Sequence, residues 1–80
     1  MLNSINTDLY KWMPDDSCYN HNIYYSKELD DIILEECDDD NFFSYYRMIE
    51  NSQYQHLGNI VSDEGIFDKG GIQEVDTNCN

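Results

Sequence analysis

Carboxylates are the most abundant side chains in this sequence that can take part in chemistry. The 80 residues include 17 Asp and Glu against four Lys and Arg, which gives a formal net charge of −13 at pH 7. The acidic residues are densest between Lys27 and Arg47, where no basic residue occurs. Unpaired carboxylates at this density attract basic surfaces over long distances and repel phosphates. The composition therefore favours a protein that binds basic partners and argues against direct binding to DNA or RNA.

Four of these carboxylates recur at a spacing that suits a helix. If residues 26–38 are helical, Glu28, Asp31, Glu35 and Asp38 fall within about 80° of one another around the axis. They then form an exposed ridge about 15 Å long, with roughly one charge every 4–5 Å. A DNA strand presents one phosphate per roughly 3.4 Å, so the two charge densities are comparable. The spacing predicts a ridge that imitates a phosphate backbone, and three further carboxylates extend its field: Glu36, Asp39 and Asp40. The alternative is an ordinary solvated helix face.

Tyrosine is the second unusual residue type. The chain has seven Tyr, three Phe and one Trp. Tyr is enriched at interfaces because its rigid ring buries a large area while its hydroxyl stays polar, and an exposed ring can stack on Arg. We predict that Tyr45, Tyr46 and Tyr54 add short-range contacts beside the acidic ridge. The alternative is that Tyr replaces Leu and Phe in a weakly hydrophobic core.

Metal and catalytic chemistry are poorly supported. Cys18 and His21 form one C-x2-H pair, whereas a structural zinc site usually has two close pairs. Segments that start at Asp39 and Asp63 lack the ligand pattern of a calcium loop. No Gly-rich phosphate loop is present, and carboxylate pairs are expected by chance in so acidic a chain. We therefore expect no enzyme activity, no metal and no cofactor.

The cysteines and the apolar runs indicate the cellular compartment. The three cysteines, Cys18, Cys37 and Cys79, are odd in number and irregularly spaced, which does not suit a disulfide framework. The first residues lack a basic stretch followed by an apolar one, so we expect no secretory signal. No apolar run is long enough to span a membrane. These observations predict reduced thiols and a cytoplasmic location.

The chain length allows one small domain over residues 1–80. We predict an α+β fold that begins with a short helix over residues 4–13. Pro14 ends this helix, and one face is shared by Ile5, Leu9, Trp12 and Met13. Residues 14–22 are expected to form a loop, and residues 23–25 a brief extended piece. Helices over residues 26–38 and 41–50 then form an acidic αα-hairpin. The expected inward faces are Leu29, Ile32, Ile33 and Cys37 in the first helix, and Phe42, Tyr45, Tyr46 and Ile49 in the second. Ser26 is the expected N-cap of the first.

The segment after Asn51 has a different pattern. Residues 53–61 are expected to be extended, with a turn at Gly58 and Asn59. Together with short extended pieces at 66–67 and 72–75 they predict a small antiparallel sheet of two or three strands. Residues 76–80 are polar and are predicted to be a mobile tail. The alternative is a mostly α-helical body with an irregular tail.

In size, charge and aromatic content the chain resembles the acidic inhibitor proteins of phages and mobile elements. These include antirestriction proteins, anti-CRISPR proteins and uracil-DNA glycosylase inhibitors. The resemblance covers the whole chain in composition and rests on no diagnostic motif. It implies a DNA mimic that blocks the basic nucleic-acid-binding channel of a host defence or DNA-processing enzyme, with the acidic ridge as the contact surface.

Two other functions fit the same composition. An immunity protein or antitoxin that neutralises a basic nuclease would use the same electrostatic contacts. An accessory or assembly subunit would bind through a Tyr-rich face and would depend less on salt.

Overall fold

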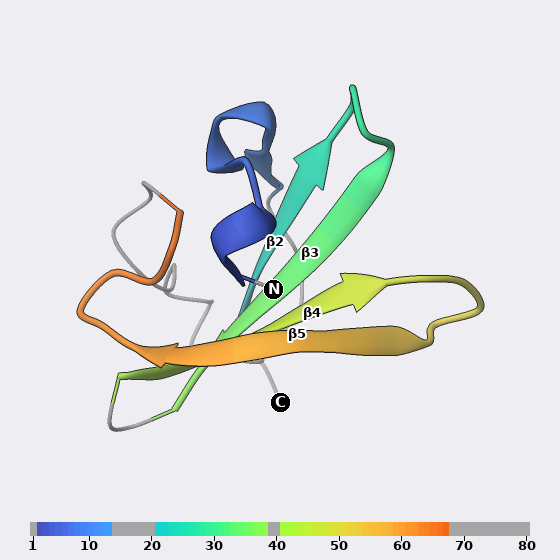
Figure 1. Cartoon of the computed structure of the whole chain (residues 1–80). Coiled ribbons are helices and arrows are strands. Elements are labelled where there is room, and N and C mark those ends of the chain that lie inside the picture. The colour runs from blue at the N-terminus through green and yellow to red at the C-terminus, as the bar shows by residue number, and fades with distance from the viewer. Residues whose placement is uncertain (1, 14–20, 39–40, 68–80) are drawn as a thin grey trace, which may run out of the picture.

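The computed structural model describes residues 2–13, 21–38 and 41–67. These residues form a five-stranded antiparallel sheet in which each strand pairs with its neighbours in the sequence, in the order β1-β2-β3-β4-β5 (Figure 1). The strands are β1 (Lys11–Met13), β2 (His21–Ser26), β3 (Asp31–Cys37), β4 (Phe42–Met48) and β5 (Tyr54–Val61). Two short 3-10 turns precede them, η1 (Leu2–Ser4) and η2 (Thr7–Leu9).

The predicted α+β fold is wrong, and so is its mostly α-helical alternative. The described part of the chain is all-β and contains no α-helix. The segment predicted as the helix 26–38 is instead a turn followed by β3, and the segment predicted as the helix 41–50 contains β4. Their β-branched and aromatic residues pack well on a pleated sheet, and this tertiary packing overrides the apparent helical spacing.

The predicted N-terminal helix over residues 4–13 is also absent. Its place is taken by η1, η2 and β1, in which Trp12 lies opposite Tyr24 of β2. Three of the four apolar residues of the predicted helical face, Ile5, Leu9 and Trp12, still pack against the core. The fourth, Met13, is 41% exposed, because alternate residues of β1 point to opposite faces. The prediction therefore identified residues that contact the core but gave them the wrong local conformation.

The hydrophobic core lies on one side of the sheet, which we call the covered face. The two N-terminal turns lie over this side (Figure 1), and Leu2 of η1 approaches Gly58 of β5. The chain after β5 returns over the same side, where Phe67 stacks on Tyr24 with ring centroids 3.8 Å apart. The buried apolar core consists of Tyr10, Tyr24, Ile33, Phe43, Tyr45, Leu57 and Phe67.

The β2–β3 and β4–β5 connections are tight turns with left-handed residues. In the β4–β5 turn Asn51 and Ser52 have φ angles of 51° and 63°, and the Gln53 amide donates to the Glu50 carbonyl over 2.8 Å. Two consecutive positive φ values define a type I′ turn, whose twist matches an antiparallel hairpin. In the β2–β3 turn Ser26 accepts a hydrogen bond from the Leu29 amide over 3.2 Å. Ser26 thus caps a turn rather than the predicted helix.

A β-bulge explains why the predicted turn at Gly58 and Asn59 is not formed. Tyr45 lies opposite Gly58 and Tyr46 lies opposite His56, so Leu57 is an additional residue in β5. Such a residue bends the strand without ending it. The extended conformation predicted for this segment is confirmed for Tyr54–Val61, and that predicted for residues 23–25 is confirmed within β2. The strand predicted at 66–67 is wrong, because the last strand of the described chain, β5, ends at Val61. The strand predicted at 72–75 and the tail at 76–80 lie outside the described residues.

Candidate functional site

The predicted acidic ridge does not form, because alternate residues of a strand point to opposite faces. Asp31 and Glu35 of β3 lie on the covered face, whereas Glu36 is exposed on the opposite one, which we call the far face. Glu28 and Asp38 lie beyond opposite ends of β3. Two further residues of the predicted ridge, Asp39 and Asp40, lie outside the described part of the chain.

Glu35 is the centre of a buried polar network. Its side chain is fully buried on the covered face. The Tyr45 hydroxyl donates to Oε2 over 2.5 Å, and the Asn22 amide donates to Oε1 over 3.0 Å. Asn22 in turn accepts a hydrogen bond from the Trp12 indole over 3.2 Å. Because every polar atom of such a network needs a partner, these contacts fix the relative positions of β1, β2, β3 and β4.

Burial makes the ionised form of Glu35 costly. Desolvation raises the pKa of this carboxyl above its ordinary value, and hydrogen bonds from Tyr45, Asn22 and Tyr24 oppose the shift only in part. Burial also raises the pKa values of the Tyr24 and Tyr45 phenols, and the nearby Glu35 carboxyl raises them further. Both phenols therefore remain protonated donors. Glu35 is thus enclosed in the interior and is not available to a partner.

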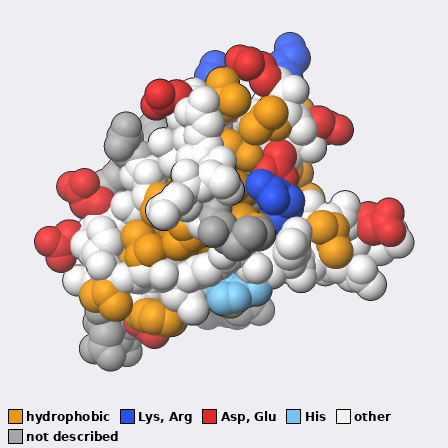
Figure 2. All heavy atoms as spheres, in the orientation of Figure 1, with side chains coloured by type: hydrophobic (Ala, Val, Ile, Leu, Met, Phe, Trp, Pro, Cys, Tyr) orange, Lys and Arg blue, Asp and Glu red, His pale blue; other side chains and the backbone are white. Residues whose placement is uncertain are grey.

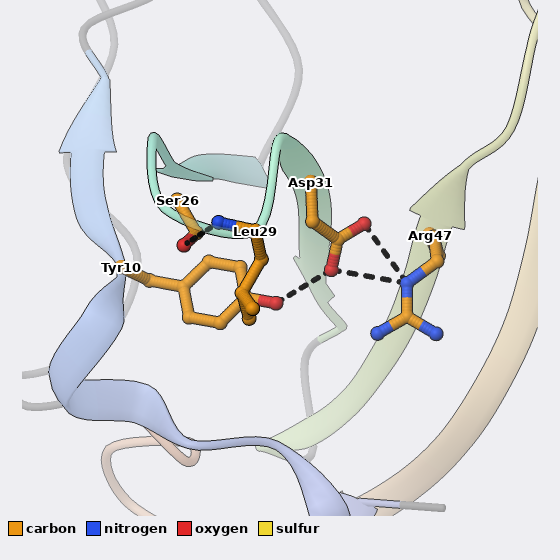
Figure 3. Close-up of polar contacts among 5 residues, drawn as sticks. All are labelled: Tyr10, Ser26, Leu29, Asp31 and Arg47. Atoms are coloured by element: carbon orange, nitrogen blue, oxygen red, sulfur yellow. Dashed lines mark hydrogen bonds and ion pairs between the residues drawn. The ribbon is translucent and has the colours of Figure 1, made fainter.

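Asp31 is likewise occupied within the protein. It lies between Arg47 and Tyr10, as Figure 3 shows. The Arg47 Nε lies 2.9 Å from Oδ1, and the Tyr10 hydroxyl donates to Oδ2 over 2.5 Å. Burial and the hydrogen bond that Tyr10 donates to Asp31 raise the pKa of Tyr10, and the hydrogen bond that Arg47 donates to Asp31 raises the pKa of Arg47. This cluster connects the N-terminal segment to β3 and β4.

We expect Arg47→Gln to lower the free energy of unfolding by about 1 kcal/mol, because it leaves the half-buried Asp31 without its counter-ion. Lys11→Gln removes the same unit of charge from an exposed side chain and is expected to change stability by less than about 0.5 kcal/mol. Urea denaturation of both variants measures this difference. Equal effects of the two substitutions would mean that only net charge matters.

The predicted tyrosine contacts are divided between the interior and the surface. Tyr45 is fully buried, and Tyr46 is half-buried on the far face with its ring 5.3 Å from that of His56. Tyr54 is 50% exposed at the start of β5. Tyr10 and Tyr24 belong to the core, so replacement of Leu and Phe by Tyr in the core accounts for part of the tyrosine content. Tyr46 and Tyr54 remain available as surface residues.

The exposed carboxylates are spread over the surface. In the described ranges the exposed acidic residues are Asp8, Glu28, Asp30, Glu36, Asp38, Glu50, Asp63 and Glu64. The exposed basic residues in the same ranges are Lys11 and Lys27. On the face drawn in Figure 2 most acidic side chains lie around the outline of the molecule, with apolar side chains between them. Among the described residues the exposed charge therefore forms a broad negative field and no single line.

One end of the sheet combines four of these residues, and we call it the acidic end: Glu36, Asp38, Asp63 and Glu64. The β3–β4 turn and the chain after β5 meet there, because the Ser62 amide donates to the Asn41 carbonyl over 3.1 Å. Asp63 and Glu64 were not among the predicted contact residues, because they lie far from Glu36 in the chain. Only the pairing of β3, β4 and β5 brings these segments together.

Comparisons of the chain with protein-family models, with curated protein sequences and with solved structures gave no match in any of the three. Within the described residues, no group of three or more His, Cys, Asp or Glu side chains is arranged to hold a metal ion. Cys18, which formed the sequence pair with His21, lies outside them. The helical turns of the described segments are too short to cross a membrane. The exposed charges and the apolar residues of the surface are therefore the features that bear on function.

Proposed function

We propose that this protein is a small acidic inhibitor that occupies a basic nucleic-acid-binding surface of another protein, as a DNA mimic does. The observation that carries the proposal is the imbalance of exposed charge. The described surface presents carboxylates from both ends of the sheet and two lysines, while Arg47 is engaged by Asp31. Such a field attracts a Lys- and Arg-lined channel at long range and excludes nucleic acid from it.

The fold changes the way in which the mimicry would work. A helical ridge would present evenly spaced charges along a line, whereas the sheet presents carboxylates from turns and strand ends. The acidic end is the part of the described surface where segments distant in the sequence converge, and we propose that it makes the first contact with the basic channel. Glu35 and Asp31 support this surface from inside and take no part in the contact.

The experiment is capture of partners from a bacterial lysate on the immobilised full chain, followed by a salt gradient. A nucleic-acid-binding protein that is released at moderate salt and is displaced by double-stranded DNA would support the proposal. A captured nuclease toxin would instead indicate an immunity protein. A partner that stays bound at high salt and ignores DNA would overturn the electrostatic mechanism.

A pair of matched variants tests whether the acidic end is the contact. We expect Asp63→Lys with Glu64→Lys to weaken binding to the captured protein about tenfold or more, through lost attraction and new repulsion. Asp8→Lys with Glu50→Lys makes the same change in net charge at exposed positions away from the acidic end. Equal losses in calorimetric affinity for the two variants would show that net charge, and not this surface, drives binding.

A further inference from the structure

The far face of the sheet carries apolar residues in two rows across the strands. In the first row Met13 lies opposite Ile23, Ile23 opposite Leu34, and Leu34 opposite Tyr46. The second row contains Tyr25 opposite Ile32, and Met48 opposite Tyr54. No residue of either row belongs to the core or is among the partly buried residues packed against it. The two rows, which we call the apolar patch, are therefore separate from the core on the covered face.

The apolar patch is accessible in the described structure. Met13 is 41% exposed and Tyr54 is 50% exposed, and the residues between them are half-buried. Other described segments flank the sheet: η1, η2 and residues 62–67. Their apolar residues pack on the covered face and not on the patch. A contiguous apolar surface on a small protein of this charge is typical of an interaction site.

The strand sequences also indicate that both faces of the sheet are covered in the functional state. Ile32, Ile33 and Leu34 are consecutive apolar residues, as are Tyr45 and Tyr46. A sheet with one solvated face shows alternation of apolar and polar residues, whereas a sheet buried on both faces shows continuous apolar runs. The described residues cover one face, so the runs predict a second layer over the other.

The charges around the apolar patch indicate which kind of partner surface would be complementary to it. Glu36 is exposed on the far face itself, Glu28 and Asp30 lie in the turn beside Ile32, and Asp38 follows the other end of β3. Two exposed lysines also border the patch, Lys11 opposite Tyr25 and Lys27 in the β2–β3 turn, so the four carboxylates outnumber the basic groups and the border stays negative. The centre of the patch lacks charged residues, which matches the apolar core and polar rim of protein interfaces. A second copy would bring two net charges of −13 together. A partner with basic residues around an apolar centre is complementary in both respects.

We propose that the apolar patch docks onto a protein surface whose apolar centre is bordered by Lys and Arg, with Leu34 and Tyr46 as its central contacts. The inference rests on the proposed function in one respect, that the partner is basic. It adds that short-range apolar contact supplies affinity that salt does not remove. The acidic carboxylates then set the rate and direction of approach, while the apolar patch determines how long the complex lasts.

The test uses a defined probe rather than an unidentified partner. A short peptide of alternating Lys and Leu is titrated into the isotope-labelled full chain, in parallel with a peptide in which Ser replaces Leu. Both peptides carry the same charge, so their difference reports apolar contact. We expect the Leu peptide to bind about tenfold more tightly, with shifts of the amide signals centred on β2, β3 and β4. Equal binding of the two peptides would overturn the proposal.

Matched variants locate the contact. Leu34→Thr is expected to remove most of the advantage of the Leu peptide, whereas Leu29→Thr makes the same chemical change in the exposed β2–β3 turn and should retain it. Unchanged amide dispersion shows that both variants stay folded. Two further results would overturn the proposal. One is nuclear Overhauser contact between residues 68–80 and the apolar patch, and the other is self-association that Leu34→Thr abolishes.

The two proposals fail in different ways. If Leu34→Thr leaves the captured protein bound while the Asp63→Lys and Glu64→Lys changes release it, the acidic end is the contact and the apolar patch is not. If Leu34→Thr releases the partner and its binding ignores both salt and DNA, the patch is an interface and the DNA-mimic function is wrong.

Discussion

Gly65→Ala is expected to lower the free energy of unfolding by about 2–4 kcal/mol, through strain and overpacking together. Gly65 has a φ of 77°, a region that residues with a side chain rarely adopt. A methyl group at this position would collide with Oε2 of Glu35 and with the Tyr45 hydroxyl. Urea denaturation followed by Trp fluorescence measures the loss.

Glu64→Ala provides the control for this prediction, because Glu64 is exposed and precedes Gly65 directly. We expect it to change stability by less than about 0.5 kcal/mol. A Gly65→Ala variant as stable as the wild type would show that residues 62–67 do not pack on the Glu35 network as described. The contact matters for function because Asp63 and Glu64 belong to the same segment, so displacement of this segment would move half of the acidic end.

Glu35→Gln is expected to remove a pH-dependent loss of stability. Because burial raises the pKa of Glu35 in the folded protein, the unfolded chain releases this proton first as the pH rises above about 4.5. In the window between that value and the raised folded pKa the folded protein holds more protons. Its stability therefore falls with rising pH, by at most about 1.4 kcal/mol per pH unit for one proton. Gln carries no such proton and lacks this slope.

Measurement of stability against pH for three proteins isolates the effect. The wild type, Glu35→Gln and Glu36→Gln are unfolded in urea between pH 4 and 8, and the two variants differ only in which neighbouring carboxyl is neutralised. Glu36 is exposed on the far face, so its variant should follow the wild-type curve closely. Parallel curves for Glu35→Gln and the wild type would contradict a raised pKa. A lower but flatter Glu35→Gln curve fits the loss of one acceptor for the Tyr45 hydroxyl.

Periodicity failed in this sequence for a reason that the structure makes clear. The predicted inward face of the first hairpin helix included Leu29 and Ile33, but Leu29 is 54% exposed in a turn while Ile33 is fully buried in β3. In the second predicted helix, over residues 41–50, Tyr45 is buried whereas Ile49 is exposed after the end of β4. Apolar residues on both faces of β3 and β4 produce adjacent apolar positions, and these match a helical pattern as well as they match a strand.

The turns held information that the helical interpretation did not use. Asp30, Asn41, Asn51 and Ser52 all have positive φ values, and Asn and Asp are among the residues that tolerate this conformation best. Each of the four lies between two strands. Short polar segments between apolar strands are typical of β-hairpins. They would have favoured an antiparallel meander over the predicted helical hairpin.

The sequence by itself determined the net charge, the shortage of basic residues, the aromatic content and the extended conformation near residues 23–25 and 54–61. These properties depend on composition and local preference, which need no knowledge of distant contacts. Only the tertiary structure decided which carboxylates face solvent. Strand pairing engaged Asp31 with Arg47 and brought the segment of Asp63 and Glu64 to the β3–β4 turn, while residues 62–67 enclosed Glu35. The accessibility of a charge depends on neighbours that are remote in the chain, and its position in the sequence carries little information about them.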